Sequence, residues 1–544
     1  MIEHKKPINK NFATVFLSIV MFFTGACGLI YEYVMSSLST FILGNSIEQF
    51  SLIIGIMMFM MAVAGWVQTQ FTDKNLIEKF IIIEILLALV GGFAPIITYY
   101  AYSQINNHFM LIMYISIISI GFLIGLEIPL ATRINEIYVK SLKKNIATVW
   151  AFDYVGSLIG AFVFALFLIK TFAITQTAIL IALINFFVGL ITYLFFSNYI
   201  KLNHKIIIPT LIITFTLLTA GLLNQSSFDE KLEQSLYKDK IIYAQSSKYQ
   251  RLIMTHNNAL NDYRLYINGN LQFSSIDEKR YHELLVHPAM KLAKSHNEIL
   301  ILGGGDGLAL REINKYNDTK QITLVDIDPE MIKVAKNNPI FQKLNNNSFN
   351  NSKIIETTFL LNELKNTSKI NNLSEIIIYT TDATKFIDID KKKYDIIIID
   401  LPDPSTIELT KLYSLEFYQK LYNSLNDKGI IVIQSTSPFY AKKTYLSIDK
   451  TLQAAKFITI PYRHNIPSFG EWGWIMAFKE TNLETFENAK NLKSFQIKTN
   501  YLTPGIFKGS LEFEKNFFNQ KVNINSLLKP SILTYYIDES WQYK

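Results

Sequence analysis

Residues 299–316, ILILGGGDGLALREINKY, decide the fold of the second half of the chain. An apolar run at 299–302 leads directly into the glycine-rich turn 303–307, and a helical pattern follows. Glycines allow positive φ angles and let a ligand approach the backbone, while the helix N-terminus lies beneath it. The sequence therefore predicts a strand, a turn and a helix that together form a nucleotide-type pocket.

The residues in and after this turn indicate which kind of ligand it binds. Leu308 stands where the dinucleotide pattern G-x-G-x-x-G needs a glycine, and Asp306 lies inside the turn. A carboxylate there is a poor neighbour for a pyrophosphate and a good one for a cation. The next apolar run ends in Asp326 and Asp328, where such folds hold an acid that binds ribose hydroxyls.

Composition divides the chain into two parts. Its 544 residues allow two to four domains, and the apolar excess behind the 50% hydrophobic content lies almost wholly before residue 225. The single cysteine, Cys27, excludes a disulfide framework and a Cys-based metal site. The net charge is +7, but the lysines are scattered among asparagines and acids. A solvated surface is therefore favoured over nucleic-acid binding.

Seven apolar windows before residue 225 are long enough to cross a bilayer, which needs about 20 residues each. They are approximately 12–37, 46–70, 77–102, 108–131, 147–170, 174–197 and 206–223. The first has no small-residue cleavage site and is followed by further spans, so we interpret it as a membrane helix, not a signal peptide. The sequence predicts an α-helical, multi-span domain over 1–224 in the cell (inner) membrane.

The second half changes to short β-rich runs and then to apolar strands that alternate with amphipathic segments. Continuous apolar strands separated by helices indicate a doubly wound sheet covered on both faces. We predict a small β domain at 225–285 and a Rossmann-like, methyltransferase-type α/β domain at 286–544. Between 341 and 375 the pattern is lost, and we expect a solvated loop with some helix at 355–364.

Acidic residues follow four of the predicted strands, where ligands of open α/β sheets bind. They are Asp306, Asp326, Asp382, Asp400 and Asp403. A single acid at a strand end is commonly a helix cap or a turn former. Several acids around one crevice repel each other in the empty pocket, and a cationic ligand would relieve that repulsion.

With these features the sequence resembles the polyamine aminopropyltransferases (spermidine synthases) over about residues 248–478. The resemblance rests on YQRLI, NGNLQFSSIDEKRYHELLVHP, GGGDGLALRE, VDIDPEMI, TDATKF, DLPDP and LYSLEFYQ. The apolar N-terminus, SFGEWGW at 468–474 and the ending YYIDESW resemble a branch that carries a multi-span region. The resemblance implies a homodimer with no permanently bound cofactor or metal, which takes decarboxylated S-adenosylmethionine as co-substrate.

The resemblance also implies which residues bind this donor. Asp326 matches the acid that binds the ribose, although the family usually has Glu there. Asp382 and Ala383 match the pair that contacts the adenine, and Gln250 matches a glutamine that contacts the nucleoside. Asp306 lies where the family's acid holds the aminopropyl ammonium.

A second group of matched residues concerns the acceptor amine. Gln272, Tyr281 and His282 match positions that line the amine tunnel. Asp400 matches the catalytic acid, and Asp403 its partner on the same loop. A diamine carries two ammonium groups, so one end must be anchored while the other loses a proton before it attacks. Asp400 suits the second task, as general base or as the group that orients the amine.

The expected reaction transfers an aminopropyl group to putrescine and gives spermidine and methylthioadenosine. An S-adenosylmethionine-dependent methyltransferase would share the glycine turn and Asp326, but it has little need for Asp306 together with Asp400 and Asp403. A third alternative is a polyamine transporter or sensor whose synthase-like domain only binds polyamine. The apolar half of the chain keeps this alternative open.

Two arguments disagree on the side of the membrane that carries the catalytic half. The basic residues between the spans fall mostly on the N-terminal side, so the positive-inside rule puts the catalytic half outside after seven crossings. The donor is expected in the cytoplasm, and we favour this side slightly.

Four acids lie within the apolar windows, where a charge costs roughly 2.5–3.5 kcal/mol or more at mid-depth. Glu84 and Asp153 are expected near helix ends, in reach of interfacial water. Glu32 and Glu127 either neutralise Arg133 or bond between helices, or they form a cation site that admits or exports polyamine.

Overall fold

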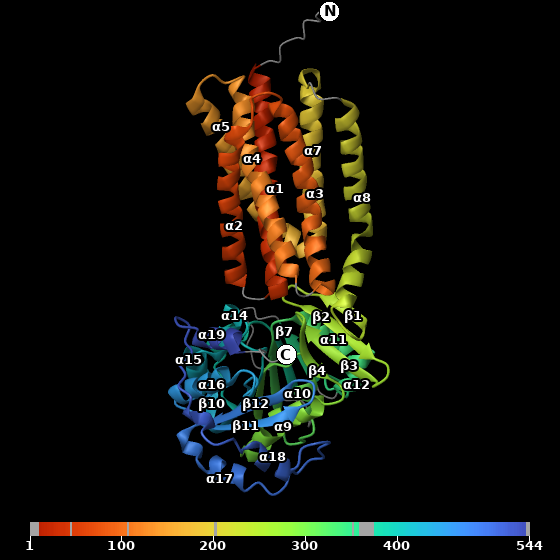
Figure 1. The fold of residues 1–544 in the computed structure, drawn as a ribbon. Coiled ribbons are helices and arrows are strands. Elements are labelled where there is room, and N and C mark those ends of the chain that lie inside the picture. Colours follow the sequence, from red (N-terminus) through yellow and green to blue (C-terminus); the bar gives the residue numbers. More distant parts are fainter. Residues whose placement is uncertain are drawn as a thin grey trace, which may run out of the picture. The chain divides into compact units, whose positions relative to one another are not determined.

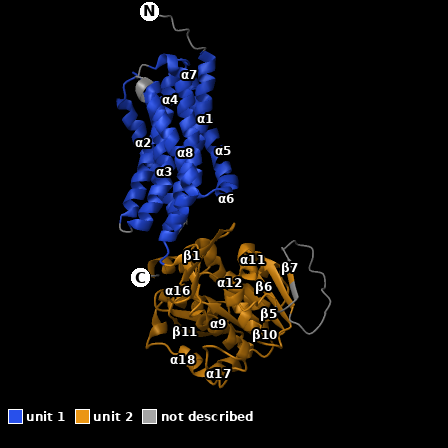
Figure 2. Ribbon diagram, turned by 90° about the vertical axis from the view of Figure 1, so that its right-hand side faces the viewer, with its two compact units in different colours: residues 1–238 blue, residues 239–544 orange. Residues whose placement is uncertain are grey.

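The computed structural model describes residues 10–43, 46–105, 108–200, 204–350, 353–357 and 375–539. The chain forms two compact units, residues 1–238 and 239–544 (Figure 2). The predicted division after residue 224 falls within the last long helix of the first unit, which continues to Ser235. The boundary between the small β domain and the Rossmann-like domain remains a prediction.

The first unit is a bundle of long helices (Figure 1). Its main helices are α1 (Lys10–Leu43), α2 (Ser46–Val67), α3 (Leu76–Gln104), α4 (Phe109–Glu136), α5 (Leu142–Val163), α7 (Ile174–Phe196) and α8 (His204–Ser235), with the short α6 (Ile169–Thr171). Among the described residues, seven helical segments are long and apolar enough to cross a membrane. Each overlaps one predicted window, because a run of about 20 apolar residues leaves the backbone only the helix to satisfy its hydrogen bonds in hydrocarbon.

Small residues let these helices pack closely. A Cβ atom at Gly156 of α5 would lie 1.9 Å from the carbonyl oxygen of Phe22 on α1, and one at Gly125 of α4 would lie 2.5 Å from Cα of Met61 on α2. These glycines belong to the pairs Gly121/Gly125 and Gly156/Gly160, whose four-residue spacing is typical of close helix contacts in membranes.

The second unit begins with a four-stranded antiparallel sheet in the order β1-β2-β3-β4. The strands are β1 (Lys240–Ser246), β2 (Arg251–Asn257), β3 (Asp262–Ile267) and β4 (Asn270–Ser274). Helix α9 (Glu278–Leu292) follows and leads into a larger sheet.

The larger sheet has eight strands among the described residues, in the order β11-β12-β10-β9-β5-β6-β8-β7. They are β5 (Glu298–Gly303), β6 (Gln321–Asp326), β7 (Lys353–Thr357), β8 (Glu375–Thr380), β9 (Tyr394–Asp400), β10 (Leu425–Gln434), β11 (Ile458–Ile466) and β12 (Gly470–Phe478). Strands β5 to β10 pair in parallel, while β12 runs antiparallel to both β10 and β11. The predicted sheet is therefore a mixed sheet that ends in a hairpin.

Helices cover both faces of this sheet, as the apolar strands predict. Alternate residues of β5 enter different cores, with Ile299 and Ile301 in one and Leu300 and Leu302 in the other. The helices are α10 (Leu308–Ile313), α11 (Pro329–Asn337), α12 (Pro339–Leu344), α13 (Ala383–Ile389), α14 (Ile407–Thr410), α15 (Leu415–Ser424), α16 (Lys442–Ala454), α17 (Glu484–Lys490), α18 (Pro504–Ser510) and α19 (Ser531–Glu539).

The segment 341–375 corrects one expectation. Residues 353–357 form the edge strand β7, which pairs with β8, so the expected helix at 355–364 is wrong at its start. The pairing with β8 sets the extended conformation of this segment, and the local sequence does not indicate that pairing. The rest of the expected helix lies outside the described residues.

Candidate active site

The glycine turn joins the ends of two neighbouring strands. Gly303, Gly304 and Gly307 have φ angles of 82°, 66° and 81°. Gly303 pairs with Asp400 at the end of β9, and a Cβ atom at Gly303 would lie only 2.0 Å from the carbonyl oxygen of Asp400. Glycine is required here for conformation and for space. It allows the turn that carries Asp306 to lie against the loop that follows Asp400.

Asp400 is held by two adjacent residues of α9. The hydroxyl of Tyr281 donates a 2.7 Å hydrogen bond to Oδ1, and Nε2 of His282 lies 4.0 Å from Oδ2. Burial and then the charge of Asp400 raise the pKa of Tyr281 well above its usual value. The phenol therefore stays protonated near neutral pH and acts as the donor.

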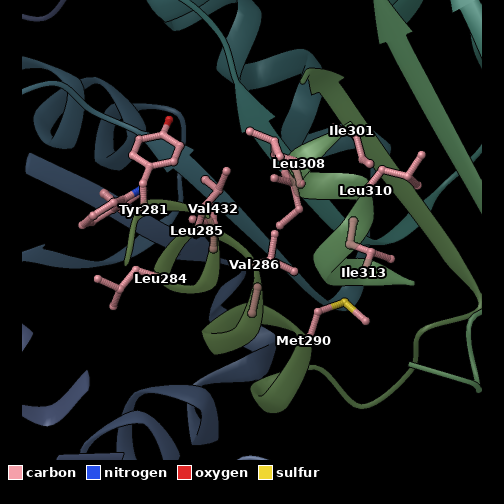
Figure 3. Close-up of a cluster of buried hydrophobic side chains, with 14 of the residues drawn as sticks. Tyr281, Leu284, Leu285, Val286, Met290, Ile301, Leu308, Leu310, Ile313 and Val432 are labelled. Atoms are coloured by element: carbon pink, nitrogen blue, oxygen red, sulfur yellow. The ribbon is translucent and has the colours of Figure 1, made fainter. Parts of the chain in front are cut away.

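The ring of Tyr281 lies at the edge of the apolar core, between two residues of the C-terminal hairpin. Its centroid is 5.5 Å from that of Trp474 and 6.2 Å from that of Phe469. Figure 3 shows the hydroxyl of Tyr281 pointing away from Leu284, Leu285 and Val286 of the same helix. The core therefore fixes the ring while its hydroxyl reaches Asp400.

Asp306 is buried close to other carboxylates. Its Oδ1 accepts the backbone N–H of Leu308 at 2.9 Å. Burial, together with the negative charges of Asp400 and Glu278, raises the pKa of Asp306 to about 6, although His282 partly opposes this shift. The position favours a cationic ligand, because a positive charge would relieve the repulsion between these carboxylates.

His282 connects the acids to a buried ion pair. Burial alone would lower the pKa of His282, but the hydrogen bond and charge of Glu278 and the charges of Asp306 and Asp400 raise it. Its Nδ1 lies 3.1 Å from Oε2 of Glu278. Arg311 binds both carboxylate oxygens of Glu278, each at 2.8 Å. These contacts fix the orientation of the imidazole ring.

Asp326 lies on the other side of the glycine turn. Its two oxygens accept the N–H groups of Gly305 at 3.0 Å and of Asp328 at 2.8 Å. Burial, then the charges of Asp328 and Asp306, raise its pKa to about 6. Asp328 has a structural role instead, because its carboxylate caps α11 and accepts the hydroxyl of Ser247 at 2.8 Å.

Asp382 and Ala383 stand at the start of α13. The carboxylate of Asp382 accepts the N–H groups of Thr384 and Lys385 and binds Nζ of Lys411 at 2.6 Å. Burial alone would raise the pKa of Asp382, but the bonds from Lys411 and Thr384 lower it. Ala383 is buried. The adenine contact implied for this pair stays a prediction.

Asp403 is bound by residues from distant parts of the chain. Its oxygens accept hydrogen bonds from Gln434 at 3.2 Å, Thr436 at 3.0 Å and Tyr536 at 3.1 Å. Burial raises the pKa of Asp403, and these three bonds oppose that effect. None of these three partners is predicted from the sequence, although Tyr536 lies in the ending YYIDESW on which the resemblance partly rests.

Two other predicted residues lie in the four-stranded sheet and its turns. Gln250 lies between β1 and β2, and its backbone exchanges hydrogen bonds with Ser247. Gln272 lies on β4, where its side chain donates to the carbonyl of Asn270 at 3.3 Å. The contacts found in the described part of the chain do not join either glutamine side chain to the acids, so their roles stay predictions.

Three buried residues near the site, Glu283, His287 and Glu312, are close enough together to suggest metal ligands. Two cationic side chains already neutralise them. Arg311 donates to Glu312 at 2.7 Å, and Lys315 forms an ion pair with the same carboxylate. We interpret the group as an ion-pair network that joins α9 to α10.

Comparisons with known proteins show the family of this chain. A family model described as the spermine/spermidine synthase domain matches residues 278–490. The polyamine aminopropyltransferase of Leptospira interrogans is 34% identical, over 96% of this chain and 98% of that protein. Polyamine aminopropyltransferase 2 of Aquifex aeolicus is 36% identical, over 96% and 98%. The solved spermidine synthase of Thermotoga maritima is 22% identical, covers 52% of this chain and 87% of its own, and has a TM-score of 0.41. The chain belongs to the polyamine aminopropyltransferase family.

Proposed function

We propose that this enzyme transfers the aminopropyl group of decarboxylated S-adenosylmethionine to putrescine and forms spermidine and methylthioadenosine. One observation carries the proposal: Asp306 follows β5 and Asp400 ends the adjacent strand β9, and the charges of both raise the pKa of His282. Such a group of acids suits a donor and an acceptor that are both cationic.

The residues divide into two tasks. Asp326, next to Gly305 of the turn, is suited to accept hydrogen bonds from ribose hydroxyls. Asp306 would hold the ammonium group of the aminopropyl chain. Asp382 and Ala383, with Gln250, would contact the nucleoside, and Gln272, with Asp403, would line the path of the amine.

In the transfer, the neutral amine nitrogen attacks the methylene carbon of the aminopropyl chain that is bonded to the sulfonium sulfur. A C–N bond forms, the C–S bond breaks, and its electron pair leaves with sulfur as a neutral thioether. The proton lost from the nitrogen passes to Asp400, either directly or through solvent. Because the sulfonium is already a good leaving group, the enzyme contributes mainly alignment and removal of that proton.

Tyr281 supports this assignment, because its hydrogen bond leaves Oδ2 of Asp400 available to the amine. His282 faces that same oxygen at 4.0 Å.

Incubation of the full-length protein with either decarboxylated or intact S-adenosylmethionine and a panel of diamines and polyamines would test the proposal. We expect spermidine and methylthioadenosine from the decarboxylated donor with putrescine. Methylated amines from the intact donor would support the methyltransferase alternative. Amine binding without any methylthioadenosine would support the transporter or sensor alternative.

We also propose that the helical unit lies in the cell membrane and that the enzyme is a homodimer. The seven apolar helices support the first proposal. Light scattering of the detergent-solubilised protein would test the second, with the mass of a monomer as the contradicting result.

A further inference from the structure

Several acids of the helical bundle are buried, and two of them are almost fully enclosed. Glu84 of α3 is 0% exposed and Glu127 of α4 is 1% exposed. The expectation that Glu84 lies near a helix end in reach of water is therefore wrong, and so is the same expectation for Asp153, which lies in the middle of α5 and is 6% exposed. Arg133 does not neutralise Glu127 either, since its guanidinium binds Asp73 and the carbonyl oxygens of Gln68 and Phe71.

The two acids contact each other and a neighbouring amide. The carboxyl groups of Glu84 and Glu127 are hydrogen-bonded, so at least one of them carries a proton. Asn185 of α7 donates from Nδ2 to Oε2 of Glu84 at 3.0 Å. Three helices thus contribute to one buried polar group.

Each of these three side chains also keeps one oxygen without a partner. Within the described residues, Oε1 of Glu84, Oε1 of Glu127 and Oδ1 of Asn185 accept no hydrogen bond, although all three residues are at most 1% exposed. A buried acceptor without a donor is costly, and more so in hydrocarbon. The hydroxyl of Tyr31 on α1 is buried and unpartnered as well.

The chemistry of these groups favours a cationic ligand. All three unsatisfied atoms are acceptors, and the pair of acids can supply two negative charges, so an anion is excluded. A primary ammonium offers three N–H donors, one for each acceptor. We propose that Glu84, Glu127 and Asn185 bind a primary ammonium group, which replaces the proton shared by the two acids.

The surroundings fit a binding site between helices. Further buried titratable side chains of the bundle include Cys27 and Tyr31 of α1 and Asp153 of α5. On α7, Gly189 lies beside Glu84, and a Cβ atom there would lie 3.2 Å from Cβ of Glu84. The choice of an ammonium ligand rests on the amine chemistry of the proposed function, whereas the cation site itself does not.

Binding of labelled putrescine and of labelled sodium to the full-length protein in detergent tests the proposal. For the wild type we expect two classes of putrescine site, one in each unit, and release of one proton for each amine bound in the bundle. Glu84→Gln with Glu127→Gln should abolish one class and its proton release. Glu136→Gln, the same change at an exposed acid at the end of α4, should keep both.

A second variant keeps the proposal testable if the double mutant does not fold. Asn185→Ala removes one acceptor. We expect it to weaken putrescine binding at the bundle site about tenfold, while the elution volume of the protein in size-exclusion chromatography stays unchanged. Unchanged putrescine binding in both variants would overturn the proposal. Sodium binding that depends on Glu84 and Glu127, without putrescine binding there, would overturn the choice of ammonium. Failure of the aminopropyl transfer would leave the dependence on Glu84 intact, so the two proposals fail separately.

Discussion

Asp400 lies beside Tyr281 and His282 of α9. Tyr281 donates to Oδ1, which leaves Oδ2 for the amine. We expect Asp400→Asn to reduce kcat by about 10²–10⁴-fold, because the amide cannot accept the proton. Donor affinity should change little, since our proposal assigns donor binding to Asp326 and Asp306. Steady-state kinetics with a donor-binding assay would check both. Asp388→Asn, which removes a carboxylate that pairs with Lys420, is the matched control. Loss of donor binding in Asp400→Asn would contradict the assignment.

Protonation of Asp306 should lower the activity at acidic pH. Its pKa of about 6 means that it is protonated below that pH and cannot hold an ammonium. We expect kcat/KM to fall as the pH drops from 8 through about 6, and Asp306→Asn to remain low at all pH values. A flat profile between pH 8 and pH 5 would contradict this role.

The same shift predicts an effect of Asp306 on stability. Because its pKa is raised in the folded state, Asp306 favours folding fully below its unfolded pKa, and that contribution is lost as pH rises through about 6. Asp306→Asn should therefore raise the thermal midpoint of the second unit at pH 8, with little change at pH 4. A lower midpoint at pH 8 would show that the carboxylate stabilises the fold.

At the scale of elements, α19 holds the loop that follows β9. Tyr536 of α19 donates to Asp403, three residues after Asp400. Tyr536→Phe should lower kcat/KM about tenfold, because a hydrogen bond to a charged group contributes about 1.5–3 kcal/mol. Tyr535→Phe is the control, since its hydroxyl accepts from the backbone of Asn523 instead. Equal effects of the two changes would contradict a specific role for Tyr536.

The sequence predicted those elements whose pattern is set locally. The apolar windows became helices, and runs such as 299–302 became buried strands, because length and hydrophobicity decide those states. β7 and the partners of Asp403 depend on contacts between distant segments, which a single sequence does not display. Asp328 shows a further limit: its pattern suits both a ligand acid and a helix cap, and only the contacts of its oxygens decide.

At the scale of the whole molecule, the side of the membrane is the main open prediction. Seven crossings would put the two ends of the chain on opposite sides, and the donor is expected in the cytoplasm. We expect a tag after Lys544 to resist protease in intact cells and to be cut after permeabilisation. A tag before Met1 should then be cut in intact cells. Cleavage of the C-terminal tag in intact cells would place the catalytic unit outside, as the basic residues predict.

The central claim is that the acids at the strand ends direct an aminopropyl group to an amine. The most direct test follows two labels through one reaction of the full-length enzyme with putrescine: one donor carries the label in its aminopropyl chain, the other in its S-methyl group. We predict that the aminopropyl label appears in spermidine and the methyl label stays in methylthioadenosine, in equal amounts. Transfer of the methyl label to the amine, or retention of both labels by the nucleoside, would contradict the claim.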